Sequence, residues 1–243
     1  MLFPLTRQIF EQLIPTVATS DQYVHYWGNF SDVFKRALIS AVSVLTIVLI
    51  NVFAHDDGDP LFLLIGITAG LYWLWGPVLL ASLRNLQFRR YPYSGLWQGR
   101  VLDVYLTEEV TGQEETVNKK GELIIVENLE QRINLEVGDK TGFVAEIQAP
   151  LRRYHQGISR GQVAVMLVMS YQQDLGQIAK CSDVYLPTVN LWVSDYPYLR
   201  RDAFVEVINQ VRLSRRKNQQ RPPSNSGERS RTRSPIDQTD PRY

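Results

Sequence analysis

Histidine and cysteine, the side chains that most often serve in acid–base, nucleophilic and metal chemistry, are rare in this chain of 243 residues. The three histidines, His25, His55 and His155, fall in three different segments. The single cysteine, Cys181, has no histidine near it in sequence and no second cysteine with which to form a disulfide. We therefore predict a structural thiol, no catalytic triad, and no bound metal or cofactor.

Two short motifs have the composition of ligand sites but lack the required pattern. Lys140 and Thr141 resemble the end of a phosphate-binding loop, yet Asp139 precedes the lysine and the glycine frame of such loops is missing. We interpret this motif as a hairpin turn. The run from His55 to Asp59 offers oxygen ligands for a divalent ion, but it separates two apolar segments, and we interpret it as a polar turn.

Aromatic, proline and arginine side chains are concentrated between Asn190 and Arg201. This composition is typical of protein interfaces, because aromatic side chains and arginine bury a large area while keeping a polar end. The candidate residues of a partner-binding surface are Trp192, Tyr196, Tyr198 and Arg200. The competing interpretation is that the three aromatic side chains are core residues, which close a β domain against the final helix.

An enzymatic function would require a pocket that gathers polar groups. The candidates for such a pocket are Arg100, Asp103 and His155, at the expected mouth of the β domain. Because these residues define no reaction, we predict that the protein is not an enzyme.

The elements that position these residues begin with two long uncharged segments. Ala37–Ala54 contains 18 residues and Leu61–Leu83 contains 23. As helices with a rise of ~1.5 Å per residue they would reach about 27 and 35 Å, and a bilayer has a hydrocarbon core of ~30 Å. We predict a transmembrane helical hairpin over residues 37–83, whose first span begins too late in the chain to be a cleavable signal peptide.

Lysine and arginine flank only one side of this hairpin. They precede the first span and follow the second, and the turn between the spans has none; the five residues are Lys35, Arg36, Arg84, Arg89 and Arg90. Because positive charge is retained on the cytoplasmic side, we expect an integral membrane protein with two spans and both termini in the cytoplasm.

The spans contain signs of helix packing and none of transport. Gly66 and Gly70 allow close approach of a second helix, either within the hairpin or in a homo-oligomer. Neither span contains Asp, Glu, Lys, Arg or His, whereas an ion or proton pathway normally needs such groups. The pattern favours an anchor in the lipid bilayer over a transporter.

The two ends of the chain differ in character. Residues 1–36 form an amphipathic N-terminal segment, in which Thr6 caps a short helix that would lie on the membrane surface or against the soluble domain. Residues 214–243 have eight basic and three acidic residues, a net charge of +5, and no apolar periodicity, so we predict a disordered tail. No aromatic residue precedes Tyr243 in this tail, so we expect no binding of nucleic acid.

Residues 91–213 alternate β-branched and aromatic residues with polar ones, and helical periodicity follows near their end. The candidate strands are Trp97–Leu106, Glu122–Glu127, Arg132–Val137, Phe143–Gln148, Val163–Ser170 and Val189–Val193. Short antiparallel strands of this number predict a small β-barrel-like domain of the OB or SH3-like kind. The expected fold is an α+β membrane protein, with the hairpin followed by this cytoplasmic domain and a C-terminal helix.

Two motifs carry a resemblance to known proteins: S-D-x-Y-L-P at Ser182–Pro187 and L-W-V-x-D-Y-P-Y-L-x-R at Leu191–Arg201. With the two apolar segments before them, they make residues 1–213 resemble a group of cyanobacterial two-helix membrane proteins of unknown function. Some of these proteins are loosely labelled phosphate transporter permeases. The resemblance implies a thylakoid or plasma membrane, while two spans without charged residues argue against a permease.

Together these observations favour a membrane-anchored, non-enzymatic interaction or assembly protein, which presents a cytoplasmic β domain to a membrane protein complex. One alternative is an accessory subunit of a membrane transport system, whose hairpin would pack beside a larger helical bundle. The other is an enzyme with a site in the mouth of the barrel.

Overall fold

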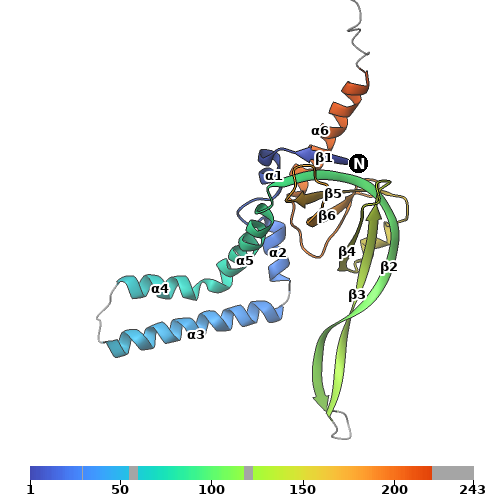
Figure 1. Cartoon of the computed structure of the whole chain (residues 1–243). Helices are drawn as coiled ribbons and strands as arrows, with labels where there is room; N and C mark the ends of the chain where they lie inside the picture. The colour runs from blue at the N-terminus through green and yellow to red at the C-terminus, as the bar shows by residue number, and fades with distance from the viewer. Residues whose placement is uncertain (29, 55–59, 118–122, 221–243) are drawn as a thin grey trace, which may run out of the picture. The chain divides into compact units, whose positions relative to one another are not determined.

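The structure, a computed structural model, describes residues 1–28, 30–54, 60–117 and 123–220. The chain divides into two units, Met1–Phe204 and Val205–Tyr243. Over the described ranges the fold is α+β, with six α-helices and an open antiparallel sheet of seven strands (Figure 1).

Five of the helices precede most of the sheet, and the sixth follows it. They are α1 (Arg7–Leu13), α2 (Ser20–Trp27), α3 (Phe30–Ala54), α4 (Pro60–Gly70), α5 (Tyr72–Arg89) and α6 (Arg201–Gln220). Thr6 caps α1 as expected, because its side chain accepts a hydrogen bond from the Ile9 N–H group. Helix α6 runs to Gln220, so residues 214–220 are helical and not part of a disordered tail. The rest of the expected tail lies outside the described residues.

The strands form a single sheet. They are β1 (Leu2–Leu5), β2 (Tyr93–Val117), β3 (Leu123–Gly138), β4 (Val144–Pro150), β5 (Val163–Ser170), β6 (Lys180–Leu186) and β7 (Leu191–Val193), with a 3-10 turn, η1 (Arg153–Gly157), between β4 and β5. Their order is β4-β3-β2-β5-β6-β7, and β1 pairs with β2. All of these pairings are antiparallel.

The expected barrel is wrong, because the sheet is open and ends at β4 and β7. The main difference from the expected strands is the length of β2, which has 25 residues and continues well beyond the expected end at Leu106. Its first eight residues pair with β5, whereas the stretch from Arg100 to Val117 pairs with β3. Strand β2 thus pairs with β5 near its start and with β3 over the rest of its length. Strands β2 and β3 continue together as a two-stranded ribbon (Figure 1).

The N-terminal segment completes the sheet domain. Strand β1 pairs with β2 from Leu2 opposite Trp97 to Leu5 opposite Ser94, a pairing that the sequence analysis did not predict. The apolar stripe of α1 is buried, with Phe10, Leu13 and Ile14 almost inaccessible to solvent. Of the two positions expected for this helix, the structure therefore shows the one against the soluble domain.

The core of the sheet lies around β5. This strand lies between β2 and β6, and seven of its eight residues are buried, as expected for a strand covered on both faces. The surrounding core side chains come from most of the other strands, and the largest contributors include Trp97, Ile133, Leu135, Met166, Val184 and Leu186.

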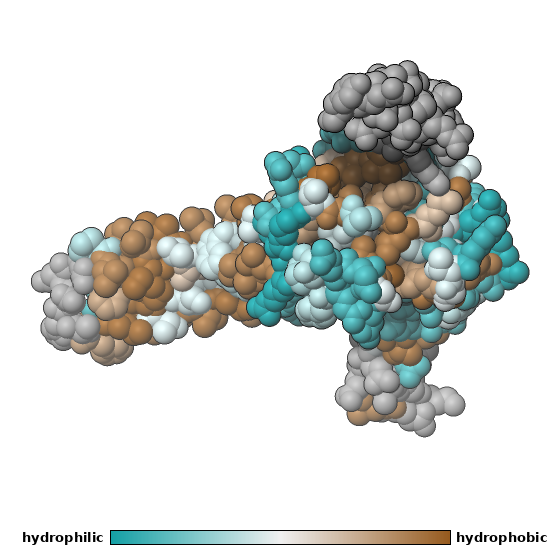
Figure 2. All heavy atoms as spheres, turned by 45° about the horizontal axis from the view of Figure 1, so that its top comes forward, coloured by the Kyte–Doolittle hydropathy of each residue, from teal (hydrophilic) through white to brown (hydrophobic). Residues whose placement is uncertain are grey.

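Helix α3 has the length and composition of a membrane span. The stretch Phe30–Phe53 has 24 residues, and only 11% of its most apolar window is buried within the molecule. Large apolar side chains such as Leu45 and Phe53 are exposed, and Figure 2 shows apolar surface over this helical region. By length and composition, α3 is the one described helix that can cross a bilayer unaided.

The second expected span is not a straight helix, because α4 and α5 meet at a bend of 72° at Leu71. Two side chains satisfy backbone groups at this break. The indole N–H of Trp75 donates to the carbonyl of Thr68, at 2.9 Å, and the hydroxyl of Ser40 on α3 accepts from the Trp73 N–H group, at 3.1 Å. Backbone groups at the bend therefore have side-chain hydrogen-bond partners.

Gly66 and Gly70 face α3 within the same chain. A β-carbon at Gly70 would lie 3.1 Å from a methyl carbon of Val44, and one at Gly66 would lie 3.8 Å from Ile47. Both glycines thus serve the close packing of the hairpin itself.

Candidate functional site

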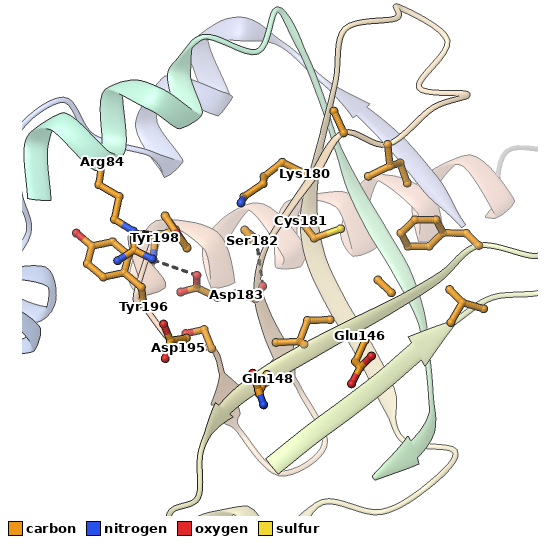
Figure 3. Close-up of a pocket in the computed structure, with 17 residues that line it drawn as sticks. Arg84, Glu146, Gln148, Lys180, Cys181, Ser182, Asp183, Asp195, Tyr196 and Tyr198 are labelled. Atoms are coloured by element: carbon orange, nitrogen blue, oxygen red, sulfur yellow. Dashed lines mark hydrogen bonds between the residues drawn. The ribbon is translucent and has the colours of Figure 1, made fainter. Parts of the chain in front are cut away.

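A cleft of about 460 Å³ lies where the helices meet the sheet (Figure 3). Its walls come from β4 and the segment before it, from β6, from Arg84 on α5, and from the segment that follows β7. The polar and aromatic groups at one end of the cleft surround Tyr196, Pro197 and Tyr198, which we call the tyrosine junction.

Asp183 on β6 holds the backbone of the tyrosine junction. Its side chain is completely buried, and Oδ1 accepts a hydrogen bond from the Tyr198 N–H group at 3.0 Å. Oδ2 has no hydrogen-bond partner in the described part of the chain. Burial raises the pKa of this carboxyl to about 7, although hydrogen bonds from the N–H groups of Tyr198 and Leu199 oppose the rise.

Gln22 and Asn85 form a buried amide pair beneath the junction. The Nε2 atom of Gln22 donates to Oδ1 of Asn85, at 2.9 Å, and Nδ2 of Asn85 donates back to Oε1 of Gln22, at 2.8 Å. The same Nε2 atom also donates to the carbonyl of Pro197, at 2.9 Å. Helices α2 and α5 and the tyrosine junction are thus joined by one set of polar contacts.

Arg84 on α5 binds both tyrosines. Its Nε atom donates to the Tyr198 hydroxyl at 2.9 Å, and its guanidinium carbon lies 4.0 Å from the ring centroid of Tyr196. Figure 3 shows these three side chains gathered beside Asp183. The guanidinium therefore makes a hydrogen bond and a cation–π contact at the same place.

Other rings enclose the two tyrosines. The ring centroid of His25 lies 5.0 Å from that of Tyr196, and the Phe88 ring lies 3.9 Å from Tyr198. Burial lowers the pKa of His25, which favours the neutral imidazole in this apolar setting. Burial raises the pKa of Tyr196, whose hydroxyl has no partner among the described residues. The junction is thus a packed contact that keeps its tyrosines protonated.

The chemistry available in the cleft is limited. Burial raises the pKa of the Cys181 thiol to about 11, which suppresses the nucleophilic thiolate. Within the described ranges, no group of three or more His, Cys, Asp or Glu side chains could hold a metal ion. The arrangement favours a structural junction with a polar cleft beside it.

The structure divides the four residues that the sequence assigned to a partner surface. Tyr196 has no exposed surface, so it is a core residue and is removed from that surface. Trp192 is half-buried against Tyr185 and Phe204, with ring centroids 4.7 and 5.4 Å away. Tyr198 is also half-buried, in the junction, and Arg200 is exposed. Binding of a partner by these last three residues stays a prediction.

The polar residues considered for an enzyme do not converge. Asp103 binds the side chain of Arg160, with 2.9 Å between Nε of the arginine and Oδ1. His155 is buried in the η1 turn, where Nδ1 accepts from the Arg152 N–H group, at 3.1 Å. Neither residue lines the cleft in Figure 3. The polar turn expected from His55 to Asp59, and the metal site considered as its alternative, lie outside the described residues.

Sequence reasoning missed several residues of the junction, among them Gln22, Arg84 and Asn85. Asp183 lies within the first of the two motifs, and its hydrogen bond to Tyr198 explains how the two motifs belong together. Gln22 and Asn85 are isolated amides in two different helices, so no local pattern could have identified them.

Comparison with known proteins identifies a family whose function is unknown. The model of a family of unknown function, DUF8619, matches residues 3–220, a range that contains the whole junction. No curated protein and no solved structure matches the chain.

The buried carboxyl should make stability depend on pH. From pH 3.8 to about 7 an unfolded chain loses the Asp183 proton while the folded chain keeps it, so stability should fall as pH rises through this window. The largest slope for one proton is ~1.4 kcal/mol per pH unit. Asp183→Asn keeps an oxygen acceptor for the Tyr198 N–H group but has no carboxyl to titrate. In chemical denaturation at a series of pH values, its stability should not show this fall with rising pH. Asp195→Asn, on an exposed carboxylate of the same cleft, is the control; an unchanged slope in Asp183→Asn would contradict the assignment.

The amide pair should show energetic coupling. Gln22→Leu and Asn85→Leu each leave a buried partner unsatisfied and should each lower stability by ~1–3 kcal/mol. The double variant should cost less than their sum, because the second change removes a group that is already unpaired. Denaturation of the three variants measures the coupling, with the exposed Gln8→Leu as control; strictly additive losses would show that the pair is not a unit.

Proposed function

The chain belongs to DUF8619, a family of unknown function, and on the structure we propose a membrane-anchored, non-enzymatic interaction or assembly protein. Helix α3 and the bent pair α4–α5 hold the chain in a bilayer. The sheet domain meets a membrane protein complex on the cytoplasmic side.

The observation that carries this proposal is the way the apolar helices are attached. An anchor on a flexible tether would leave the orientation of its domain free. Here the C-terminal part of α5 is fixed to the sheet domain, because Asn85, Arg84 and Phe88 all contact the tyrosine junction or its partner Gln22. A domain held in this way is presented to the bilayer in one orientation.

The bent pair supports a second span. Together α4 and α5 are long and apolar enough to form one broken span, and backbone groups at the bend are satisfied by side chains. The five cationic residues at the ends of the hairpin support an orientation with both termini in the cytoplasm. The thylakoid or plasma membrane that the resemblance implies stays a prediction.

Exposed groups on the sheet domain supply a contact surface. Arg200 is exposed, and the ribbon of β2 and β3 carries exposed apolar side chains at Leu106, Val110 and Leu129. An exposed apolar patch bordered by polar groups is typical of protein contact sites. Beyond β4 and β5 the two strands of the ribbon pair with each other and with no other described strand, and such a ribbon is marginally stable in water on its own, so a partner would stabilise it.

One observation favours the accessory subunit of a transport system as a second candidate. An apolar groove of about 740 Å³ runs along α3, lined by Ala37, Ser40, Ala41 and Val44, and by Gly70 and Trp73 on the bent pair. Small residues of this kind admit a neighbouring transmembrane helix.

The anchor is tested by membrane extraction and by cysteine labelling. We expect the chain to stay with membranes in alkaline carbonate. In a Cys181→Ser background, an impermeant maleimide added to intact cells should label Asp57→Cys and should label Ser226→Cys only after permeabilisation, because the cationic flanks hold the termini inside. Release of the chain by carbonate would contradict the anchor, and the reverse labelling would contradict the orientation.

The interaction surface is tested by purification in mild detergent followed by mass spectrometry. Arg200→Ala should reduce the amount of a co-purified membrane complex and should change stability by no more than ~0.5 kcal/mol, because the side chain is exposed. Arg153→Ala, on an exposed arginine elsewhere in the domain, should retain the complex. If Arg200→Ala retains the same proteins as the wild type, Arg200 is not part of the surface.

A further inference from the structure

A second cleft, of about 600 Å³, lies at the start of α3. It is lined by residues of α2 and α3, by Tyr72 and Leu80 of α5, by Glu130 and Arg132 of β3, and by Pro150, Arg152 and Asp195. Lys35 and Arg36 line it from α3, immediately before the uncharged segment that begins at Ala37. It is separate from the cleft beside the tyrosine junction, although Asp195 borders both.

Arg36 is a buried cation in the wall of this cleft. Only 8% of the residue is exposed. Its Nε atom donates to the carbonyl of Asp32 at 2.9 Å, and its Nη2 atom donates to the carbonyl of Tyr26. Nη1 is buried without a partner among the described residues. Both acceptors are uncharged, so the guanidinium has an unused donor and an unneutralised charge, which is costly to bury.

The carboxylates of the cleft are bound to other cations. Asp32 lies 3.7 Å from Nζ of Lys35, and Arg132 lies 3.6 Å from Asp195 and 3.8 Å from Glu130. Burial lowers the pKa of His25, so this side chain favours its neutral form. Arg152 is exposed at the edge, and no ion pair is seen for it in the described part of the chain. The two arginines Arg36 and Arg152 therefore remain available to an anion.

The anion that suits these residues is a phosphate group. A guanidinium presents parallel N–H donors that match phosphate oxygens, and the bond is charge-assisted. In the membrane orientation proposed above, Arg36 stands at the end of the span, at the depth of the lipid headgroups. We propose that this cleft binds the phosphate of an anionic lipid of the cytoplasmic leaflet, with Arg36 and Arg152 as its ligands.

The lipid would connect two parts of the structure. Arg36 belongs to the anchor helix α3, whereas Arg152 follows β4 in the sheet domain. One phosphate held by both arginines would add a contact between anchor and domain at the membrane surface. The assignment of the phosphate to a lipid rests on the proposed membrane anchor. The binding of a phosphate group rests on the cleft alone.

The test uses the full chain, purified and delipidated in a zwitterionic detergent. Native mass spectrometry measures retention of phosphatidylglycerol against phosphatidylcholine with the same acyl chains. We expect preferential retention of phosphatidylglycerol by the wild type. Arg152→Ala should lower its affinity about tenfold, the change expected for one charge-assisted bond. Arg153→Ala, on the neighbouring exposed arginine that does not line the cleft, should bind like the wild type.

Arg36 needs a conservative change, because it also binds the end of α2. Arg36→Lys keeps the charge but loses the free Nη1 donor, so it should bind phosphatidylglycerol more weakly, and its melting temperature reports whether the contacts to Asp32 and Tyr26 are kept. Equal retention of both lipids, or wild-type binding by Arg152→Ala, would overturn the site.

Inorganic phosphate distinguishes the source of the ligand. Competition by inorganic phosphate as strong as that by phosphatidylglycerol would overturn the lipid assignment and leave a site for free phosphate. Failure of the anchor gives a different result. A chain that carbonate releases from membranes but that still binds phosphate through Arg152 would contradict the membrane anchor and support the phosphate site.

Discussion

The way the helices meet the sheet depends on hydrogen bonds to the backbone of the tyrosine junction. Tyr196, Pro197 and Tyr198 have no helical or strand structure, yet they pass through the interior where helices and sheet meet. Buried N–H and C=O groups without partners are costly, so this segment needs donors and acceptors from side chains. Asp183 accepts from the Tyr198 N–H group, and Gln22 donates to the carbonyl of Pro197. These two contacts bring α2 and β6 to one place.

The position of the helical hairpin follows from this requirement. Gln22 is itself held by Asn85, so α5 must approach the junction closely enough for an amide pair, and Arg84 then lies over the ring of Tyr196. The apolar helices begin where these contacts end. The helix pair is therefore attached to the sheet domain through groups that tolerate little displacement, because hydrogen bonds weaken steeply with distance and angle.

Charge is distributed to match this arrangement. At the junction the guanidinium of Arg84 is bound by a hydroxyl and two rings, and the apolar surroundings raise the pKa of the buried Asp183 carboxyl. The cleft at the start of α3 is different, because its carboxylates are already paired while Arg36 is not neutralised. The charges that hold the junction and the arginines available for a ligand thus belong to two different clefts. In the anchored interaction protein proposed above, the first cleft would hold the domain and the second would meet the membrane surface.

The sequence by itself determined the features that depend on neighbouring residues. The uncharged run of Ala37–Ala54 gives α3, Thr6 caps α1, and the apolar run Val163–Ser170 gives β5, because each pattern is local. Only the tertiary structure decided the bend at Leu71, the pairing of β1, the length of β2 and the burial of Tyr196. The exposure of an aromatic side chain depends on what covers it, and here the cover comes from α2 and α5, more than 100 residues away in the sequence. The types of residue near Tyr196 were consistent with both an interface and a core, and the long-range contacts chose the core.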